Sequence, residues 1–112
     1  MGQLLYGFTA PPIALDDRIL QYVQIISATK LRRHESFTLT WVHADGGIRE
    51  TLWMQPSIPL RFVFDRVEPE KLDVGLLREL LEAASTWSGM TVDPLAWRER
   101  EAAHRPRLAH AA

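Results

Sequence analysis

The stretch that decides the fold spans residues 36–64 and reads SFTLTWVHADGGIRETLWMQPSIPLRFVF. Apolar residues recur at about every second position in three segments of this stretch, at residues 37–42, 48–54 and 60–64. A period of two is typical of a strand with one buried face. We therefore predict three consecutive strands that pair as an antiparallel meander.

An Asp-Gly-Gly sequence at residues 45–47 separates the first two strands and is typical of a hairpin turn. If the Asp-Gly pair lies at the centre of the turn, Thr38 faces Trp53 across the two strands. If the Gly-Gly pair lies there, Thr40 faces Trp53 instead. The two registers differ by two residues and keep the apolar residues on the same face, so the sequence leaves both open.

The predicted meander has an apolar face and a polar face. The apolar face, which should pack on helices, carries Phe37, Leu39, Leu52, Phe62 and Phe64. The polar face, which we call the predicted outer surface, carries Thr38, Thr40, Arg49, Thr51, Trp53, Gln55 and Arg61. This surface is the candidate binding site, because Trp53 places a large aromatic side chain among polar residues.

Helical patterns precede and follow the meander. Asp16 and Asp73 each suit an N-cap position, since their carboxylates can accept the backbone N–H groups of a first turn. We predict a first helix from Asp16 to about Arg33. A second helix should begin near Asp73 and end before Gly89, a residue suited to the left-handed position beyond a helix.

Shorter elements complete the pattern. Residues 4–8 and 13–15 are predicted to form an N-terminal hairpin, and residues 90–92 a last strand. A short helix should open at the Asp-Pro pair of residues 93–94, because proline suits the first helical position. From about Glu99 the chain is polar, and we expect it to fray or be disordered.

The predicted order is β-β-α-β-β-β-α, followed by the short strand and the short helix. We predict an α+β fold, a two-layer sandwich in which both main helices pack on one face of an antiparallel sheet. In this interpretation residues 1–93 form a single α+β domain. Residues 94–112 form a C-terminal helical extension and a flexible tail.

Composition and charge narrow the functional classes. The 112 residues suffice for one domain with its own core. The chain has no cysteine, which excludes disulfides and suits a reducing compartment, so we expect a cytoplasmic protein. No apolar run is long enough to cross a membrane, and we expect no membrane partner. A formal net charge of -1 argues against nucleic-acid binding driven by bulk charge.

Two interpretations of Trp53 are open. With Arg49 and Arg61 on the same face, its ring could stack on a base of single-stranded nucleic acid, an interaction of about 1–3 kcal/mol per base. Alternatively, Trp53 packs against the C-terminal segment around Trp97 or across an interface between two copies of the chain. We favour the packing interpretation.

A basic cluster at the end of the first helix is a second candidate site, and it consists of Lys30, Arg32, Arg33 and His34. These side chains could contact phosphates, which would make binding depend on salt. The simpler interpretation, which we favour, is that their positive charge complements the C-terminal end of the helix dipole.

The sequence shows no catalytic or metal-binding constellation. Its histidines are scattered, and none has a partner with ligand chemistry four residues away. The carboxylates do not form a spaced acid–base pair, and Gly46 and Gly47 belong to a hairpin rather than to a phosphate-binding loop. We predict no catalytic residue, no cofactor and no metal.

Two phrases, KLRRHESF at residues 30–37 and TLWMQPSIPLRFVF at residues 51–64, resemble a group of short actinobacterial proteins. Members of this group form a domain of unknown function and are commonly named ATP-dependent DNA ligase. The resemblance extends over residues 1–92. It departs at His34, where the group carries a glycine, so we expect the first helix to end differently in this chain.

The ligase name implies a lysine nucleophile in a Lys-x-Asp-Gly motif. The nearest match is Lys71-Leu72-Asp73, but Val74 stands where glycine is required. The chain is also too short for an adenylation domain, and we predict no autonomous ligase activity. Our leading hypothesis is a non-catalytic interaction module that binds a second copy or a protein partner through the predicted outer surface. The alternative is a DNA- or RNA-associated accessory protein.

Overall fold

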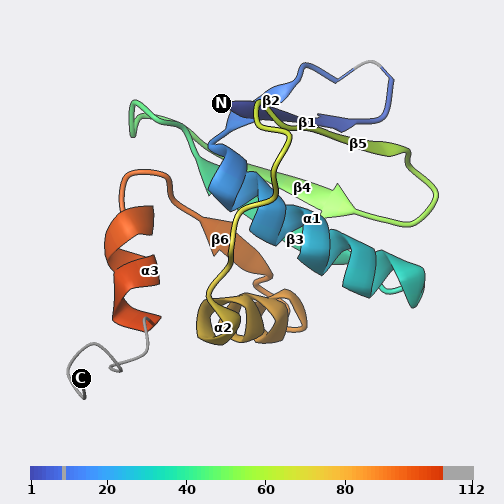
Figure 1. Ribbon diagram of the computed structural model, residues 1–112. Coiled ribbons are helices and arrows are strands. Elements are labelled where there is room, and N and C mark those ends of the chain that lie inside the picture. Colours follow the sequence, from blue (N-terminus) through green and yellow to red (C-terminus); the bar gives the residue numbers. More distant parts are fainter. Residues whose placement is uncertain (9, 105–112) are drawn as a thin grey trace.

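The computed structural model describes residues 1–8 and 10–104, whose strands and helices follow the predicted order (Figure 1). The strands are β1 (Gly2–Tyr6), β2 (Ile13–Leu15), β3 (Phe37–Val42), β4 (Arg49–Met54), β5 (Leu60–Val63) and β6 (Met90–Val92). The helices are α1 (Asp17–Arg32), α2 (Val74–Ala84) and α3 (Trp97–His104). The α+β class and the N-terminal hairpin of β1 and β2 are confirmed.

The strands form two sheets, whereas the sequence predicted one antiparallel sheet. Sheet A has the order β2-β1-β5, and sheet B has the order β4-β3-β6. The predicted meander is correct for the β3–β4 hairpin but wrong for the third strand, because β5 pairs with β1. Arg61 therefore lies opposite Leu5 in sheet A and not beside Trp53.

Tyr6 explains why β5 does not continue from β4. The Tyr6 hydroxyl donates a hydrogen bond to the backbone carbonyl of Trp53 and accepts one from the backbone N–H of Gln55 at 3.3 Å. It thereby occupies backbone groups with which an adjacent strand would pair. Further along, the carbonyl of Pro59 accepts a hydrogen bond from the N–H of Gly7 at 2.9 Å. This bond directs the chain onto β1.

Sheet B combines an antiparallel and a parallel pair. The β3–β4 hairpin has the register with Asp45 and Gly46 at the centre, in which Thr38 lies opposite Trp53. Gly46 adopts φ 75°, a left-handed conformation that glycine tolerates. The predicted last strand is present as β6, but it pairs in parallel with β3 and so departs from the antiparallel prediction.

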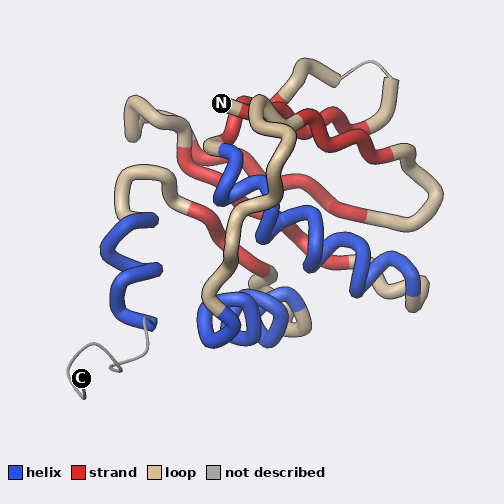
Figure 2. The backbone as a smooth tube through the Cα atoms, in the orientation of Figure 1, coloured by secondary structure: helices blue, strands red, loops and turns tan. Residues whose placement is uncertain are grey.

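Helices α1 and α2 pack on the same side of the strands and bury the core (Figure 2). Both predicted N-caps are confirmed. The carboxylate of Asp16 accepts from the N–H of Arg18 at 2.9 Å, and that of Asp73 accepts from the N–H of Leu76 at 2.9 Å. The largest fully buried side chains are Tyr22, Leu4, Leu15, Leu20, Ile26, Leu39, Met54, Leu76, Leu80 and Met90.

The connection between β5 and α2 runs across α1 (Figure 2). Gln21 holds it in place, because the Gln21 amide donates to the Glu70 carbonyl at 3.0 Å and accepts from the Glu70 N–H at 2.7 Å. The buried carboxylate of Asp17 accepts from the N–H groups of Asp65 and Arg66 at 3.2 and 3.0 Å. Polar side chains of α1 thus satisfy the backbone of this connection.

The first helix ends in a left-handed residue even without glycine. His34 has φ 60°, and its N–H donates to the carbonyl of Leu31 at 3.0 Å. His34 therefore occupies the left-handed position that favours glycine, and the helix end includes the unfavourable contact of a Cβ atom in this conformation.

Gly89 lies beyond α2 but does not cap it. The helix ends earlier, at Ala84, and Ser85 is its C-cap residue. Gly89 does adopt φ 73°, and a Cβ atom there would lie 2.4 Å from the carbonyl oxygen of Thr38. Glycine at this position therefore allows β6 to enter sheet B beside β3.

The C-terminal segment is more ordered than expected. Helix α3 begins at Trp97, not at the Asp-Pro pair, and continues to His104, so the expected fraying from Glu99 is wrong for these residues. Trp97 and Glu101 are buried, and Trp97 meets the ring of Tyr22 edge-on at a centroid distance of 5.3 Å. Residues 105–112, the rest of the predicted tail, lie outside the described residues.

Candidate functional site

The structure divides the predicted outer surface. Five of its residues, Thr38, Thr40, Arg49, Thr51 and Trp53, belong to β3 and β4 and share one face of sheet B. Arg61 lies in sheet A, and Gln55 follows β4, where its N–H contacts the Tyr6 hydroxyl. The prediction that all seven residues share one sheet face is therefore wrong for Arg61, because β5 leaves the meander.

A row of threonines crosses the middle of this face. Thr40 lies opposite Thr51 on β4 and beside Thr91 on β6. The hydroxyls of Thr40 and Thr51 are joined by a hydrogen bond of 2.7 Å, and the Thr40 side chain is buried between its neighbours. Thr91 was absent from the predicted surface, since only the parallel pairing of β6 places it there.

Trp53 is exposed at the end of this face. Its side chain is 61% exposed, whereas Phe37, Leu39 and Trp41 of the same hairpin are buried. The segment around Trp97 does not cover it, because Trp97 is itself buried against Tyr22 in the core. That alternative for Trp53 is therefore wrong for the described part of the chain.

A second exposed tryptophan lies near Trp53 and was missed from the sequence. Trp87, in the loop between α2 and β6, is 95% exposed. Trp53 and Trp87 line a shared groove of about 230 Å³, together with Thr38 and Lys30. The sequence gives one signal for Trp87: the polar residues around it, Ser-Thr-Trp-Ser-Gly, indicate a loop and not a helical stripe.

We call Trp53, Trp87, Thr38, Thr51 and Arg49 the tryptophan surface. It joins the outer face of sheet B to the loop after α2. Apart from Arg49, its side chains are uncharged. Such a surface offers aromatic area and hydroxyl groups but little charge.

The predicted basic cluster does not act as one patch. Lys30 is only 7% exposed, and its ammonium group donates to the Ser85 hydroxyl at 3.1 Å and pairs with Glu35 at 3.2 Å. Arg32, Arg33 and His34 are exposed at the end of α1. Lys30 thus reaches the groove of the tryptophan surface as a neutralised, structural residue, while the other three face solvent.

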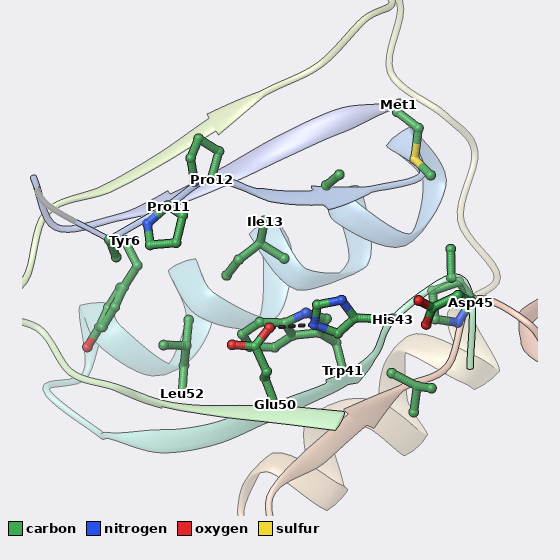
Figure 3. A pocket seen from close by; sticks show the side chains of 15 residues that line it. Met1, Tyr6, Pro11, Pro12, Ile13, Trp41, His43, Asp45, Glu50 and Leu52 are labelled. Atoms are coloured by element: carbon green, nitrogen blue, oxygen red, sulfur yellow. Dashed lines mark hydrogen bonds and ion pairs between the residues drawn. The ribbon is translucent and has the colours of Figure 1, made fainter. Parts of the chain in front are cut away.

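A larger cleft of about 570 Å³ lies between the two sheets (Figure 3). Its upper wall in Figure 3 carries Pro11, Pro12 and Ile13, and its lower wall carries Leu52 and Trp41. No sequence pattern predicts this cleft, because it exists only where sheets A and B separate. Its volume is typical of a ligand site.

Polar groups gather at one end of this cleft. An imidazole–carboxylate contact joins His43 and Glu50, and the His43 ring stacks on Trp41 at a centroid distance of 6.5 Å. Asp45 adds a second carboxylate to the lining. The lining includes no lysine or arginine side chain among the described residues. The cleft therefore combines apolar walls with an acidic end.

A buried ionic network connects α1 to α3. Both carboxylate oxygens of Glu101 accept from Nε of Arg18, at 2.7 and 2.6 Å, and the Tyr22 hydroxyl donates to Glu101 at 2.7 Å. Burial, and then the bond to Glu101, raise the pKa of Tyr22 to about 12. The bond to Glu101 also raises the pKa of Arg18. Arg18 and Tyr22 are both hydrogen-bonded to Glu101, and we interpret this network as holding α3 against α1.

Two classes of site have no support in residues 1–8 and 10–104. Histidines and carboxylates of this part of the chain nowhere gather in a group of three or more that would suit a metal ion. In the same residues, each helix is too short or too polar to cross a bilayer.

Comparisons with known proteins identify the family but not its activity. Searches of curated proteins and of solved structures found no significant match. A family model described as a domain of unknown function, DUF7882, matches residues 1–95. The match includes both sheets, α1, α2, the tryptophan surface and the inter-sheet cleft, whereas α3 follows it. The chain therefore belongs to the DUF7882 family of domains of unknown function.

Proposed function

We propose that this chain is a non-catalytic interaction module that assembles with a second copy of itself through the tryptophan surface. One observation carries the proposal: Trp53 and Trp87 are 61% and 95% exposed and line the same groove. Large aromatic side chains are the residues that contribute most to protein interfaces when they are buried there. We place the module in the cytoplasm, because a chain without cysteine suits a reducing compartment.

The chemistry of the surface favours a second copy as the partner. Its side chains are uncharged except Arg49, so one copy meets another without strong repulsion. The whole chain has a formal net charge of only -1, and a charge near zero does not oppose self-association. A symmetric dimer would also bury two Trp53 side chains, one from each copy, because both copies present the same surface.

Nucleic acid fits this surface less well. Arg61 lies in the other sheet, and Lys30 is paired with Glu35, so Arg49 alone accompanies Trp53. A single cation offers few phosphate contacts, and these supply most of the affinity for nucleic acid. We therefore do not propose nucleic-acid binding, but the experiment below would detect it.

Light scattering coupled to size exclusion tests the proposal. The unchanged chain should run as a dimer at micromolar concentration, and both Trp53→Ala and Trp87→Ala should shift it toward the monomer. Phe8→Ala is the matched control, because Phe8 is 90% exposed outside the tryptophan surface and its loss should leave the dimer intact. Circular dichroism checks that each variant keeps its fold.

A monomer for the unchanged chain at all concentrations would overturn the proposal. Titration with labelled single-stranded and double-stranded DNA at low salt then tests whether the tryptophan surface binds nucleic acid instead. Binding that weakens with salt and is lost in Trp53→Ala would assign the surface to nucleic acid.

A further inference from the structure

The inter-sheet cleft lies beside an unpaired strand edge. Sheet B has the order β4-β3-β6, so β4 is an edge strand. The N–H of His43 donates to the carbonyl of Ile48 at 2.8 Å, which makes these two residues a hydrogen-bonded pair of the hairpin. Because such pairs alternate along an antiparallel ladder, Glu50 and Leu52 direct their backbone groups toward β3, whereas Arg49, Thr51 and Trp53 direct theirs away from it.

Tyr6 shows which way this edge faces. It belongs to β1 of sheet A, and its hydroxyl binds the outward carbonyl of Trp53 and the outward N–H of Gln55. The outer edge of β4 therefore faces sheet A. At the other end of β4, the outward N–H and C=O groups of Arg49 and Thr51 have no hydrogen-bond partner within residues 1–8 and 10–104. An exposed row of this kind is a template for another strand.

The opposite wall does not supply the missing strand. Pro11 and Pro12 line the cleft on the side of sheet A, and proline has no N–H to donate. Figure 3 shows Tyr6 at one end of the cleft, Asp45 at the other, and the two prolines and Ile13 across from Leu52. The space between the walls is thus lined by Glu50 and Leu52 of the edge strand β4 on one side and by an apolar wall on the other.

The side chains along β4 define what could fill this space. Glu50 and Leu52 point into the cleft and are two residues apart, so they meet alternate side chains of a neighbouring strand. Glu50 and Asp45 make the end of the cleft acidic, and no lysine or arginine side chain lines it among the described residues. A basic residue suits the position opposite Glu50, and an apolar residue suits the position opposite Leu52.

We propose that the cleft binds an extended peptide that adds to the outer edge of β4, with a lysine or arginine opposite Glu50 and an apolar residue two positions away opposite Leu52. Main-chain hydrogen bonds to Arg49 and Thr51 hold the peptide, and the two side-chain positions give specificity. This site differs from the tryptophan surface, because the peptide uses the backbone edge of Arg49 and Thr51 and the face of β4 that carries Glu50 and Leu52. The side chains of Arg49, Thr51 and Trp53 lie on the other face.

The probe is a fluorescein-labelled peptide, Thr-Val-Thr-Lys-Thr-Val-Thr, acetylated and amidated at its ends. Its alternation places Val, Lys and Val on one face in either direction of binding. Fluorescence anisotropy should show saturable binding. A peptide with glutamate in place of lysine should bind about tenfold more weakly. We expect the peptide to add antiparallel to β4, so that the two threonines flanking the lysine lie opposite Arg49 and Thr51; N-methylation of these threonines should abolish binding.

Variants of the chain test the two halves of the site. Thr51→Pro removes the outward N–H and should weaken binding at least about tenfold, since proline at a strand edge blocks addition of another strand. Thr51→Val is the matched control: it also loses the hydroxyl bond to Thr40 but keeps the N–H, so binding should be unchanged. Glu50→Gln should weaken binding about threefold, as expected for a partly exposed ion pair.

Amide hydrogen exchange on the unchanged chain gives a readout that needs no variant. Before the peptide is added, the amides of Glu50 and Leu52 should exchange slowly and those of Arg49 and Thr51 quickly. The peptide should slow exchange at Arg49 and Thr51. No saturable binding below about 1 mM, or binding without protection of these two amides, would overturn the proposal.

A final comparison separates this site from self-association. Trp53→Ala should abolish the dimer and leave the peptide affinity unchanged. If the peptide instead loses its binding in Trp53→Ala, it occupies the tryptophan surface, and the proposal for the cleft is wrong. If the chain is a monomer yet binds the peptide at β4, the proposed dimer fails and the peptide site stands.

Discussion

The hydroxyl of Tyr6, at the end of one sheet, donates a hydrogen bond to the backbone carbonyl of Trp53, near the end of the edge strand of the other sheet. The Tyr6 side chain thus joins the two sheets by hydrogen bonds, as backbone groups join the strands within a sheet. Tyr6→Phe removes the hydroxyl and leaves the Trp53 carbonyl and the Gln55 N–H without it. We expect the free energy of unfolding to fall by about 1–2 kcal/mol.

Urea denaturation followed by circular dichroism measures this loss. Tyr6→Phe is preferred to Tyr6→Leu, because leucine would also remove the packing area of the ring. Phe8→Ala, a change at an exposed side chain, is the control and should leave the free energy of unfolding unchanged. An unchanged midpoint for Tyr6→Phe would show that the bond is not needed to hold the sheets together.

The left-handed end of α1 gives a second prediction. His34 has φ 60°, where a Cβ atom is unfavourable, and glycine avoids this contact. His34→Gly should therefore stabilise the fold by up to about 1 kcal/mol, as glycine does at helix termini of this type. His34→Ala keeps the Cβ atom and should give no gain. Urea midpoints of the two variants, compared at the same slope, decide the matter.

Stability at alkaline pH provides a third prediction. The ordinary pKa of tyrosine is 10.0, and burial together with Glu101 raises the pKa of Tyr22 to about 12. Between these values the folded chain keeps the phenol proton while the unfolded chain releases it. Stability is therefore complete below pH 10 and falls as the pH rises toward 12.

Absorbance at 295 nm can follow this titration, because the chain has only two tyrosines. One of the two should ionise late, and that late step should vanish in Tyr22→Phe. The fall in melting temperature between pH 10 and pH 12 should also be shallower in Tyr22→Phe. An equal fall in both proteins would assign the alkaline loss to other groups.

A fourth prediction concerns the helix beyond the family match. Removal of the Glu101 carboxylate leaves Arg18 and the Tyr22 hydroxyl without their shared partner. Glu101→Ala should lower the free energy of unfolding by about 2–3 kcal/mol, since a buried partner of a charge is lost. Glu99→Ala, on the exposed side of the same helix, should have little effect. Thermal melts at pH 7 compare the two.

The incomplete Lys-x-Asp-Gly motif at residues 71–74 leads to a fifth prediction. Asp73, the third residue of the nearest lysine motif, caps α2 with its carboxylate, and Val74 begins that helix. Lys71 itself is exposed, and glycine is missing from the position that follows Asp73. Incubation with radiolabelled ATP and magnesium should yield no covalent AMP adduct. A labelled band that disappears in Lys71→Ala would contradict this expectation.

Local signals in the sequence were sufficient for much of the fold. Asp16 and Asp73 correctly predicted where α1 and α2 begin, because an N-cap acts through hydrogen bonds to residues two or three positions away. The Asp-Gly turn and the alternating apolar residues on either side of it likewise predicted the β3–β4 hairpin. Each of these features depends on neighbours along the chain.

Signals of longer range were not available from the pattern. The alternation of β5 is the same whether it pairs with β4 or with β1, so adjacency in sequence suggested the wrong neighbour. Because β5 pairs with β1, Arg61 lies in sheet A and not beside Trp53, and a cleft lies between the two sheets. Trp87 and Thr91 joined the surface only through the path of the chain after α2.

The parallel pair of β3 and β6 also sets the order in which the fold can be completed. Leu39 pairs with Met90, so sheet B stays one strand short until most of the chain has been synthesised. Until then the emerging hairpin presents Phe37, Leu39 and Trp41 together with a bare strand edge, a combination that invites association between unfinished chains. Completion of sheet B therefore depends on a pairing between residues far apart in the chain, which slows folding and prolongs this exposure.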